Sequence, residues 1–232
     1  MENSDCVWVE KITKRVLNRT ILDKFDFVFY SGHTYAMLGR NGSGKSTCMK
    51  ILSGNTKPNG GQIVYFGDKL RPEFKENIAY LPPGQVFYSY MRIDDVAKYM
   101  SDFFTNFDKE IFYKIISDLK LDRRSKLLKL STGEYEKVKI ASVFSRKCSI
   151  YLLDEPFNGL DTISKEYTYN LIKEKKKEKK LIIITSHIME GLEQIIDDYL
   201  ILDKGRLAYS DTYREGEKTL EESYLETIKE GE

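Results

Sequence analysis

A run of consecutive residues near the N-terminus could bind phosphate groups. Gly39-Arg40-Asn41-Gly42-Ser43-Gly44-Lys45-Ser46 matches the pattern G-x-x-x-x-G-K-[ST], with a short apolar run before it and helical spacing after it. Glycines let the backbone N–H groups of such a loop surround phosphate oxygens, and the N-terminus of the following helix adds a positive field. The pattern predicts an enzyme that hydrolyses or transfers a nucleotide phosphate, with Lys45 on the β- and γ-phosphates and Ser46 on Mg²⁺. The residues expected to bind the nucleotide are Gly39, Asn41, Gly42, Ser43, Gly44, Lys45, Ser46 and Thr47.

Two carboxylates close an apolar run later in the chain. Asp154 and Glu155 directly follow Ile150–Leu153, and paired acids at the end of a buried strand need a cation or a reacting proton. We expect Asp154 to hold Mg²⁺, directly or through water, and Glu155 to act as general base on an attacking water molecule. Two acids that merely cap a helix are the alternative.

A histidine follows another apolar run. His187 comes after Leu181–Thr185 and Ser186, where it could sense a γ-phosphate and orient the water; a purely structural histidine is the alternative. The other histidine, His33, lies in a predicted turn and is expected to have no functional role. The residues assigned to catalysis are Lys45, Glu155 and His187, and those assigned to the metal are Ser46 and Asp154.

Alternating strands and helices must position these residues. Apolar and polar residues alternate near the N-terminus, as in half-buried strands, whereas residues 86–148 show helical spacing. The expected strands lie near residues 7–9, 25–29, 34–38, 62–66, 77–81, 150–153, 181–185 and 199–202. This alternation predicts an α/β sheet with crossover helices, into which the helical block is inserted as a lobe.

Composition excludes several classes of protein. The chain has 232 residues and a formal net charge of +1, which argues against a strongly basic nucleic-acid binder, so no nucleic-acid partner is expected. Its longest apolar runs have four residues, whereas a membrane-spanning helix needs about 20. The N-terminus has no secretory pattern, and three dispersed cysteines fit neither a disulfide framework nor a zinc site. We therefore expect a soluble protein of the reducing cytoplasm.

Five short strings, taken together, identify a family. Leu130-Ser131-Thr132-Gly133-Glu134 resembles the LSGGQ signature of ABC-type ATPases, and it stands between GRNGSGKST and IYLLDEP in the family's order. NGLD and TSH follow where that family has its D-loop and its histidine. The resemblance covers the chain from about Val7 to Tyr209. It implies an α/β fold: a P-loop NTPase (RecA-like) core with an antiparallel β subdomain and an inserted α-helical lobe.

The resemblance also implies how the chain is divided. Residues 1–232 would form a single ABC ATPase domain. Residues 1–85 and 149–212 would be the catalytic core with the β subdomain. Residues 86–148 would be the helical lobe that carries the signature, and residues 213–232 a C-terminal helical tail.

The resemblance further implies ATP hydrolysis in a head-to-tail dimer. Each ATP would lie between the phosphate loop of one subunit and the signature of a second copy or a homologous domain. Ser131 and Gly133 open an amphipathic segment, so their donors would point along a helix N-terminus at an anion. The nucleotide contacts expected from the second subunit are Ser131, Gly133, Glu134 and Asp161.

Two positions depart from the family pattern. Val16 stands where an aromatic residue usually stacks on adenine; Trp8 or Tyr30 could compensate, although their spacing does not favour it. Pro83 stands where the Q-loop glutamine is usual, and Gln85 comes two residues later. We hypothesise that coupling persists through the position of the loop, with Gln85 as a partial substitute at most.

The leading functional interpretation is the ATPase subunit of an ABC transporter. Its transmembrane permease would be a separate chain, and the protein would lie in the cytoplasm against the inner face of the cell membrane. The resemblance is closest to exporters of drugs, peptides or lipid-like compounds. The alternative is a soluble ABC ATPase that assembles or remodels a partner complex. Translation and DNA-repair ATPases of this family need a second domain or a long coiled coil, and small-molecule kinases lack the signature.

Two charged segments fall outside these motifs. Lys173–Lys180 is interpreted as a solvated helix face, with contact to anionic lipid or a partner as the alternative. Residues 211–232 contain eight acidic and three basic side chains. A helix there could dock through Leu220, Tyr224 and Leu225.

Overall fold

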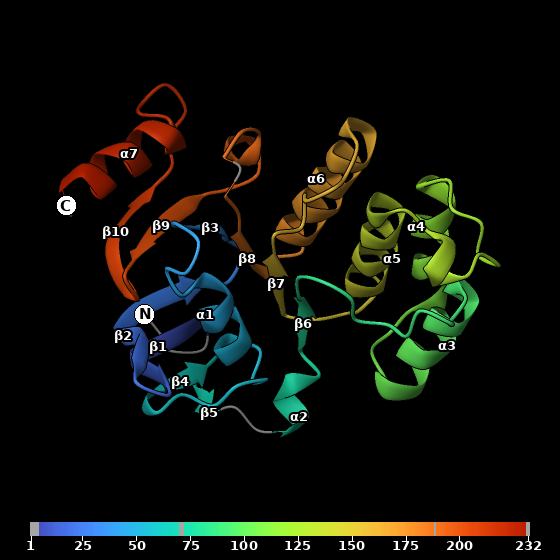
Figure 1. Cartoon of the computed structure of the whole chain (residues 1–232), viewed down its shortest axis with the longest axis horizontal. Coiled ribbons are helices and arrows are strands. Elements are labelled where there is room, and N and C mark those ends of the chain that lie inside the picture. Colours follow the sequence, from blue (N-terminus) through green and yellow to red (C-terminus); the bar gives the residue numbers. More distant parts are fainter. Residues whose placement is uncertain (1–4, 70–71, 188, 231–232) are drawn as a thin grey trace.

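A six-stranded sheet forms the centre of the computed structural model, which describes residues 5–69, 72–187 and 189–230 (Figure 1). Its strands are β3 (Thr34–Leu38), β6 (Ile78–Leu81), β7 (Ile150–Asp154), β8 (Leu181–Thr185), β9 (Asp198–Asp203) and β10 (Arg206–Thr212). The order is β10-β9-β3-β8-β7-β6, and every pair except β9–β10 is parallel. The residues of β3, β7 and β8 are all buried, as expected for parallel strands covered on both faces.

Strand β10 was not expected from the sequence, because its residues are mostly exposed and polar. It pairs antiparallel with β9 across a two-residue loop, Lys204-Gly205, in which both residues have positive φ (46° and 81°). Such loops favour the twist of a tight hairpin. The residues Asp203-Lys204-Gly205 favour a tight turn, and this turn was therefore the feature of the sequence that could have predicted the strand.

A second, antiparallel sheet confirms the predicted β subdomain. It contains β1 (Cys6–Val16), β2 (Arg19–Tyr30), β4 (Gly60–Tyr65) and β5 (Asp68–Lys69), in the order β2-β1-β4-β5. Helix α1 (Lys45–Leu52) packs between this sheet and the central one, and its Cys48, Met49, Ile51 and Leu52 belong to the same buried cluster as residues of both sheets. The apolar face of α1 therefore joins the subdomain to the core.

Helices cover the other side of the central sheet and form the predicted lobe. The lobe contains α3 (Ile93–Phe103), α4 (Lys109–Asp118), a 3₁₀ helix (Leu127–Lys129) and α5 (Thr132–Phe144). Figure 1 shows these helices grouped beyond β6 and β7, on the far side from the β subdomain. The remaining helices are α2 (Pro72–Lys75), α6 (Thr162–Lys177), a 3₁₀ helix (Leu192–Gln194) and α7 (Leu220–Glu230). In the described part of the chain, no helix combines the length and the apolar character needed to cross a membrane.

The C-terminal helix docks through two of the three residues predicted for it, Leu220 and Tyr224, but not through Leu225. Leu220 and Ile228 are buried and Tyr224 is partly buried, but Leu225 is 47% exposed. Leu225 lies five residues after Leu220, and at about 100° per residue it points away from the buried face. The prediction for Leu225 was therefore wrong.

The lysine-rich end of α6 is only partly solvated. Lys175 lies over the Tyr151 ring and pairs with Glu178 at 3.0 Å, while Lys176 pairs with Asp197 at 2.6 Å. The expectation of a solvated face is therefore wrong for Lys175, whose aliphatic stem covers core surface.

A buried arginine fastens the lobe to the central sheet. Arg146 donates from Nη1 to the Ile78 carbonyl at 2.8 Å and from Nη2 to the Glu76 carbonyl at 2.6 Å. Its Nε donates to Asn106 Oδ1 at 3.1 Å, and its guanidinium lies 3.8 Å from the centre of the Phe104 ring. One side chain thus joins the end of α5, the start of β6 and the connection between α3 and α4.

Replacing this arginine should destabilise the whole fold. Arg146→Met keeps much of the volume but removes the charged donor from the Ile78 carbonyl and one of the donors from the Glu76 carbonyl, which keeps Asn106 Nδ2, so we expect a loss of about 3 kcal/mol in the free energy of unfolding. Urea unfolding followed by circular dichroism would measure it. The control is Arg123→Met, which removes an exposed ion pair to Asp94 and should cost less than about 1 kcal/mol. Equal losses in the two variants would contradict the proposed role of Arg146.

Candidate functional site

The glycine-rich loop between β3 and α1 needs glycine for space as well as for conformation. Gly39 and Gly44 have φ of 152° and 109°. A Cβ on Gly39 would lie 2.4 Å from the Leu202 carbonyl oxygen, and a Cβ on Gly44 would lie 2.8 Å from Leu22 Cδ2. Residues of β9 and β2 therefore pack directly against the loop and leave no room for a side chain at Gly39 or Gly44.

The first turn of α1 offers a positive end to an anion. Its first N–H groups have no carbonyl four residues earlier within the helix, and Gly44 provides no side-chain cap. There is no acidic residue in this turn, so the helix dipole is not compensated locally. Loop and helix together form an arrangement that can bind phosphate oxygens.

Lys45 lies across its own loop. Its ammonium donates to the carbonyl of Gly39 at 2.6 Å and to that of Arg40 at 3.1 Å. Burial lowers the pKa of Lys45, and the carboxylates of Glu155 and Asp154 act in the opposite direction. The Lys45 side chain is therefore held beside the loop that the sequence assigned to phosphate.

Asp154 ends β7 and is held by hydroxyl groups from three elements. Its Oδ1 accepts from Ser46 Oγ of α1 at 3.2 Å and from Thr185 Oγ1 of β8 at 2.5 Å. Tyr80 of β6 donates to Oδ2 at 3.4 Å, and burial, then the charge of Asp154, raises the pKa of Tyr80. The carboxylate is only 2% exposed, yet each of these three partners is neutral.

The sequence did not single out Tyr80 and Thr185. Thr185 is the register partner of Asp154 on the neighbouring parallel strand, and Tyr80 lies on β6, the other neighbour of β7. The usable signal was that both residues are hydroxyl-bearing and stand near the carboxyl ends of predicted strands. Which strands are neighbours, however, is a property of the folded sheet.

The oxygen atoms around Asp154 suit a magnesium ion. Magnesium prefers oxygen ligands, and a buried carboxylate whose partners are neutral hydroxyls favours a cation. Within the described residues there is no group of three or more His, Cys, Asp or Glu side chains able to hold a metal. Ser46 and Asp154 therefore fit an ion that is bound by few protein atoms and completed by phosphate oxygens and water.

Glu155 and His187 lie together beside this carboxylate. Glu155 Oε2 is 2.8 Å from His187 Nδ1, and the backbone N–H of Glu155 donates to the Thr185 carbonyl at 3.1 Å. Glu155 has φ of 56°, a left-handed conformation that is uncommon for a residue with a Cβ. Backbone outliers of this kind concentrate at functional sites. The structure thus brings together Lys45, Ser46, Asp154, Glu155 and His187.

The signature residues form the N-terminus of α5. Ser131 Oγ accepts from the backbone N–H of Glu134 at 3.2 Å, and Glu134 Oε2 accepts from the Ser131 N–H at 2.8 Å, which makes a capping box. The hydrogen bond from the Ser131 backbone N–H, and then that from the Ser131 hydroxyl to the same carboxylate oxygen, lower the pKa of Glu134. Glu134, which the sequence assigned to the nucleotide, here accepts the Ser131 N–H at the N-terminus of its own helix.

The signature also contacts the predicted D-loop. A Cβ on Gly133 would lie 2.5 Å from the Gly159 carbonyl oxygen, so the two segments pack backbone to backbone. Asp161 caps α6 by accepting from the Ser164 N–H at 2.8 Å, and it pairs with Lys137 of α5 at 2.8 Å. The hydrogen bond from Lys137 is the main reason that the pKa of Asp161 is well below its usual range. Ser131, Gly133, Glu134 and Asp161 thus form a second cluster.

The two departures from the family pattern have clear positions. Val16 is 51% exposed at the end of the β1–β2 hairpin that contacts the loop through Leu22. Trp8 and Tyr30 belong to the opposite end of this hairpin; eight residues of strand separate Trp8 from Val16, about 26 Å. They therefore do not replace an aromatic residue at position 16. Gln85 lines a hollow with Ser131 and Tyr135, on the signature side of the loop that contains Pro83.

Comparison with known proteins agrees with this geometry. The family model for ABC transporters matches residues 22–158. The uncharacterized ABC transporter ATP-binding protein MJ1023 of Methanocaldococcus jannaschii is 32% identical over 206 residues, which cover 87% of this chain and 75% of that protein. The bacitracin transport ATP-binding protein BcrA of Bacillus licheniformis is 30% identical, over 84% of this chain and 66% of its own length. A solved ATP-binding subunit of an ABC transporter superposes with a TM-score of 0.87 at 25% identity, covering 96% of this chain and 99% of its own.

The chain belongs to the family of ABC transporter ATP-binding proteins. Its fold is that of a P-loop NTPase cassette, as the resemblance implied. It is accordingly an ATP-binding, ATP-hydrolysing subunit of a transporter.

The contact between Gly133 and Gly159 can be tested by adding one methyl group. Gly133→Ala should push α5 away from the loop that leads back to Glu155. Small misplacements of this kind can cost up to about 100-fold in rate, and we expect ATPase activity to fall at least about tenfold. Binding of a fluorescent ATP analogue to the monomer should change less than about threefold, because the phosphate loop is untouched.

The matched control is Gly60→Ala in β4. A Cβ on Gly60 meets its nearest neighbour at an ordinary 3.9 Å, so this variant should keep wild-type activity. If Gly133→Ala were as active as Gly60→Ala, the contact with Gly159 would have no part in catalysis.

Proposed function

We propose that this chain hydrolyses ATP at the carboxyl end of β7, in a head-to-tail pair with a second copy or a homologous domain. The observation that carries the proposal is the buried Asp154 carboxylate, which is 3.2 Å from Ser46 Oγ and adjoins the Glu155–His187 pair. In this proposal residues 39–47 bind the ATP phosphates, and Ser46 and Asp154 hold Mg²⁺. The bound ion would neutralise charge on the phosphates.

Glu155 is the proposed general base. Its Oε2 would accept the proton of the attacking water, and His187, which lies 2.8 Å from the same oxygen, would hold that carboxylate in place. His187 is half exposed, so it can also face the γ-phosphate. Lys45 would exchange its contacts with the carbonyls of its own loop for phosphate oxygens of ATP.

The second copy would supply the signature side of the site. The N-terminus of α5, with Ser131 and Gly133, is a helix end suited to an anion, although Glu134 is near. The capping box orients Ser131, and the contact with Gly159 ties this helix end to the loop that begins at Glu155. In the paired state Asp161 would exchange its contact with Lys137 for groups of the other subunit.

We further propose that the transporter is an exporter of peptides, drugs or lipid-like compounds. The likeness to BcrA, a protein named for bacitracin transport, supports this direction; relatives at similar identity also include one named for ribose import. The proposed division of the chain is residues 1–85 and 149–212 as core, 86–148 as lobe and 213–232 as tail. The permease would hold this chain at the inner face of the cell membrane.

An exposed apolar patch suits the permease. It consists of Val86, Tyr88, Tyr90 and Leu128, all between 47% and 75% exposed. The rings of Tyr88 and Tyr90 stack at 5.5 Å, and Leu128 donates its N–H to the Ser89 carbonyl, which places the two segments side by side. Aromatic side chains on the surface are typical of protein interfaces. We propose this patch as the surface that contacts a cytoplasmic segment of the permease.

The role of Glu155 is tested by Glu155→Gln. The amide cannot accept a proton, so kcat should fall at least about 100-fold while ATP still binds. Size-exclusion chromatography with ATP and Mg²⁺ should then show a stable dimer. Lys45→Ala is the contrasting variant, because it should lose ATP binding and stay monomeric. A Glu155→Gln protein that remains monomeric with ATP bound would remove the main support for the paired site.

The patch is tested by the double variant Tyr88→Ser/Tyr90→Ser. A membrane protein that co-purifies with the wild-type chain from detergent extracts should be reduced about tenfold, while basal ATPase activity stays within about twofold. Leu225→Ser on α7 is the matched control, since Leu225 is also exposed, and it should retain the partner. Recovery of a wholly soluble partner would instead favour the assembly ATPase.

A further inference from the structure

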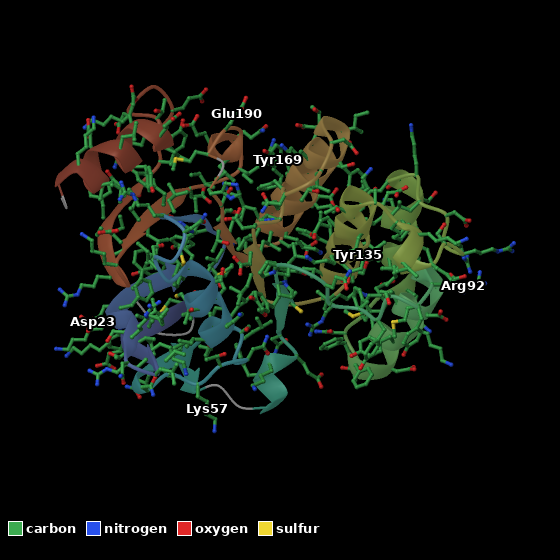
Figure 2. All side chains as sticks on the ribbon, in the orientation of Figure 1. Asp23, Lys57, Arg92, Tyr135, Tyr169 and Glu190 are labelled. Carbon is green, nitrogen blue, oxygen red and sulfur yellow. The ribbon has the colours of Figure 1, made fainter. Side chains whose placement is uncertain are left out.

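A tyrosine of the signature helix holds the segment that follows the Pro83 loop. Tyr135 is in the first turn of α5, and its hydroxyl oxygen accepts the backbone N–H of Val86 at 2.8 Å and that of Phe87 at 2.9 Å. Tyr135 is only 9% exposed. Figure 2 labels it on α5, within the lobe. One phenol oxygen thus uses both of its lone pairs to bind two successive amides of a segment outside any helix or strand.

The Pro83 loop has few backbone N–H groups of its own with which to bind the signature helix. Pro82 and Pro83 have no N–H groups to donate, and Gly84 turns the chain with φ of 78°. After this turn Phe87 is buried against Tyr99 of α3. The loop therefore leaves β6 stiffly and is then fastened to the lobe.

The N-terminus of the signature helix also contacts the loop that follows Glu155. Tyr135 follows directly after the signature residues 130–134, and Gly133 packs against the Gly159 carbonyl. The loop that contains Gly159 begins at Glu155, whose carbonyl accepts the N–H of Asn158 at 3.3 Å. A displacement of residues 83–87 would therefore reach both the signature and the general base through the Tyr135 hydroxyl.

We propose that Tyr135 is a positioning residue that couples the Pro83 loop to the signature motif. Pro83 offers no side-chain polar atom, so the mechanical link runs through the hydrogen bonds of Tyr135. This inference rests on the proposed function, because it assigns the link to the paired, ATP-hydrolysing state. The residue itself contacts neither phosphate nor water in this role.

The test is Tyr135→Phe, which removes one oxygen atom and keeps the ring. Hydrogen–deuterium exchange of the Val86 and Phe87 amides should become about tenfold faster, because both lose their acceptor. The kcat for ATP should fall about fivefold, while KM changes less than twofold, because the phosphate loop is intact. Unchanged exchange at both amides, or an unchanged kcat, would overturn the proposal, and so would a rise in KM that accounts for the whole loss.

Tyr167→Phe is the matched control. The Tyr167 hydroxyl donates to Asp118 Oδ2 at 2.7 Å. It is also a phenol hydrogen bond between two segments, but it joins α6 to α4. This variant should keep wild-type kcat, and its Val86 and Phe87 amides should exchange at the wild-type rate. If it lowered kcat as much as Tyr135→Phe, the effect would be a general loosening of the lobe, and the proposal would fail.

The outcome can be separated from that of the paired-site proposal. Dimer formation by Glu155→Gln tests the pairing alone, with Tyr135 unchanged. If that dimer forms and Tyr135→Phe is fully active, only the positioning role is wrong. If that dimer does not form, the paired site is wrong, and the exchange rates together with kcat still decide whether Tyr135 holds the loop in a working enzyme.

Discussion

The site depends on one constraint: a carboxylate, Asp154, is buried at the end of a central strand, and its hydrogen-bond donors among the described residues are neutral hydroxyl groups. Burying a charge is costly unless hydrogen bonds and a cation compensate. Three hydroxyl groups from α1, β6 and β8 supply those hydrogen bonds, so the phosphate loop and both neighbouring strands must lie in register with β7. The parallel order β8-β7-β6, and the glycines that let the loop approach, serve this same requirement.

The sequence predicted most of the fold and the contiguous motifs, since these depend on local order along the chain. Lys45, Ser46, Asp154, Glu155 and His187 were all found from runs of neighbouring residues, and the structure brings them together. Contacts between distant segments were not predicted, because no local pattern records which strands or helices become neighbours. Thr185, Tyr80, Arg146 and Tyr135 are residues of this kind. The prediction for Leu225 was wrong because the buried face of the helix was assigned from apolar residues alone, without their angular positions.

The lobe is connected to the catalytic core at distinct points that differ in chemistry. Arg146 is a buried cation that binds backbone carbonyls at the start of β6. Gly133 meets Gly159 by close backbone packing, and Tyr135 holds the segment after the Pro83 loop by hydrogen bonds. The first contact is expensive to break, whereas contacts made by packing or by neutral hydrogen bonds can rearrange at lower cost. This difference in the cost of breaking the contacts would let the lobe shift near the signature while it stays attached at β6.

The left-handed backbone of Glu155 places the catalytic role proposed for this residue in conflict with the stability of the fold. A residue with a Cβ costs roughly 1–2 kcal/mol in this conformation, and glycine would relieve it. Glycine there would also delete the carboxylate that faces His187. Selection for thermal robustness alone would therefore remove Glu155. An inactive cassette descended from this one would be free to gain stability at this position, whereas a cassette that uses Glu155 as proposed must offset the strain through packing elsewhere.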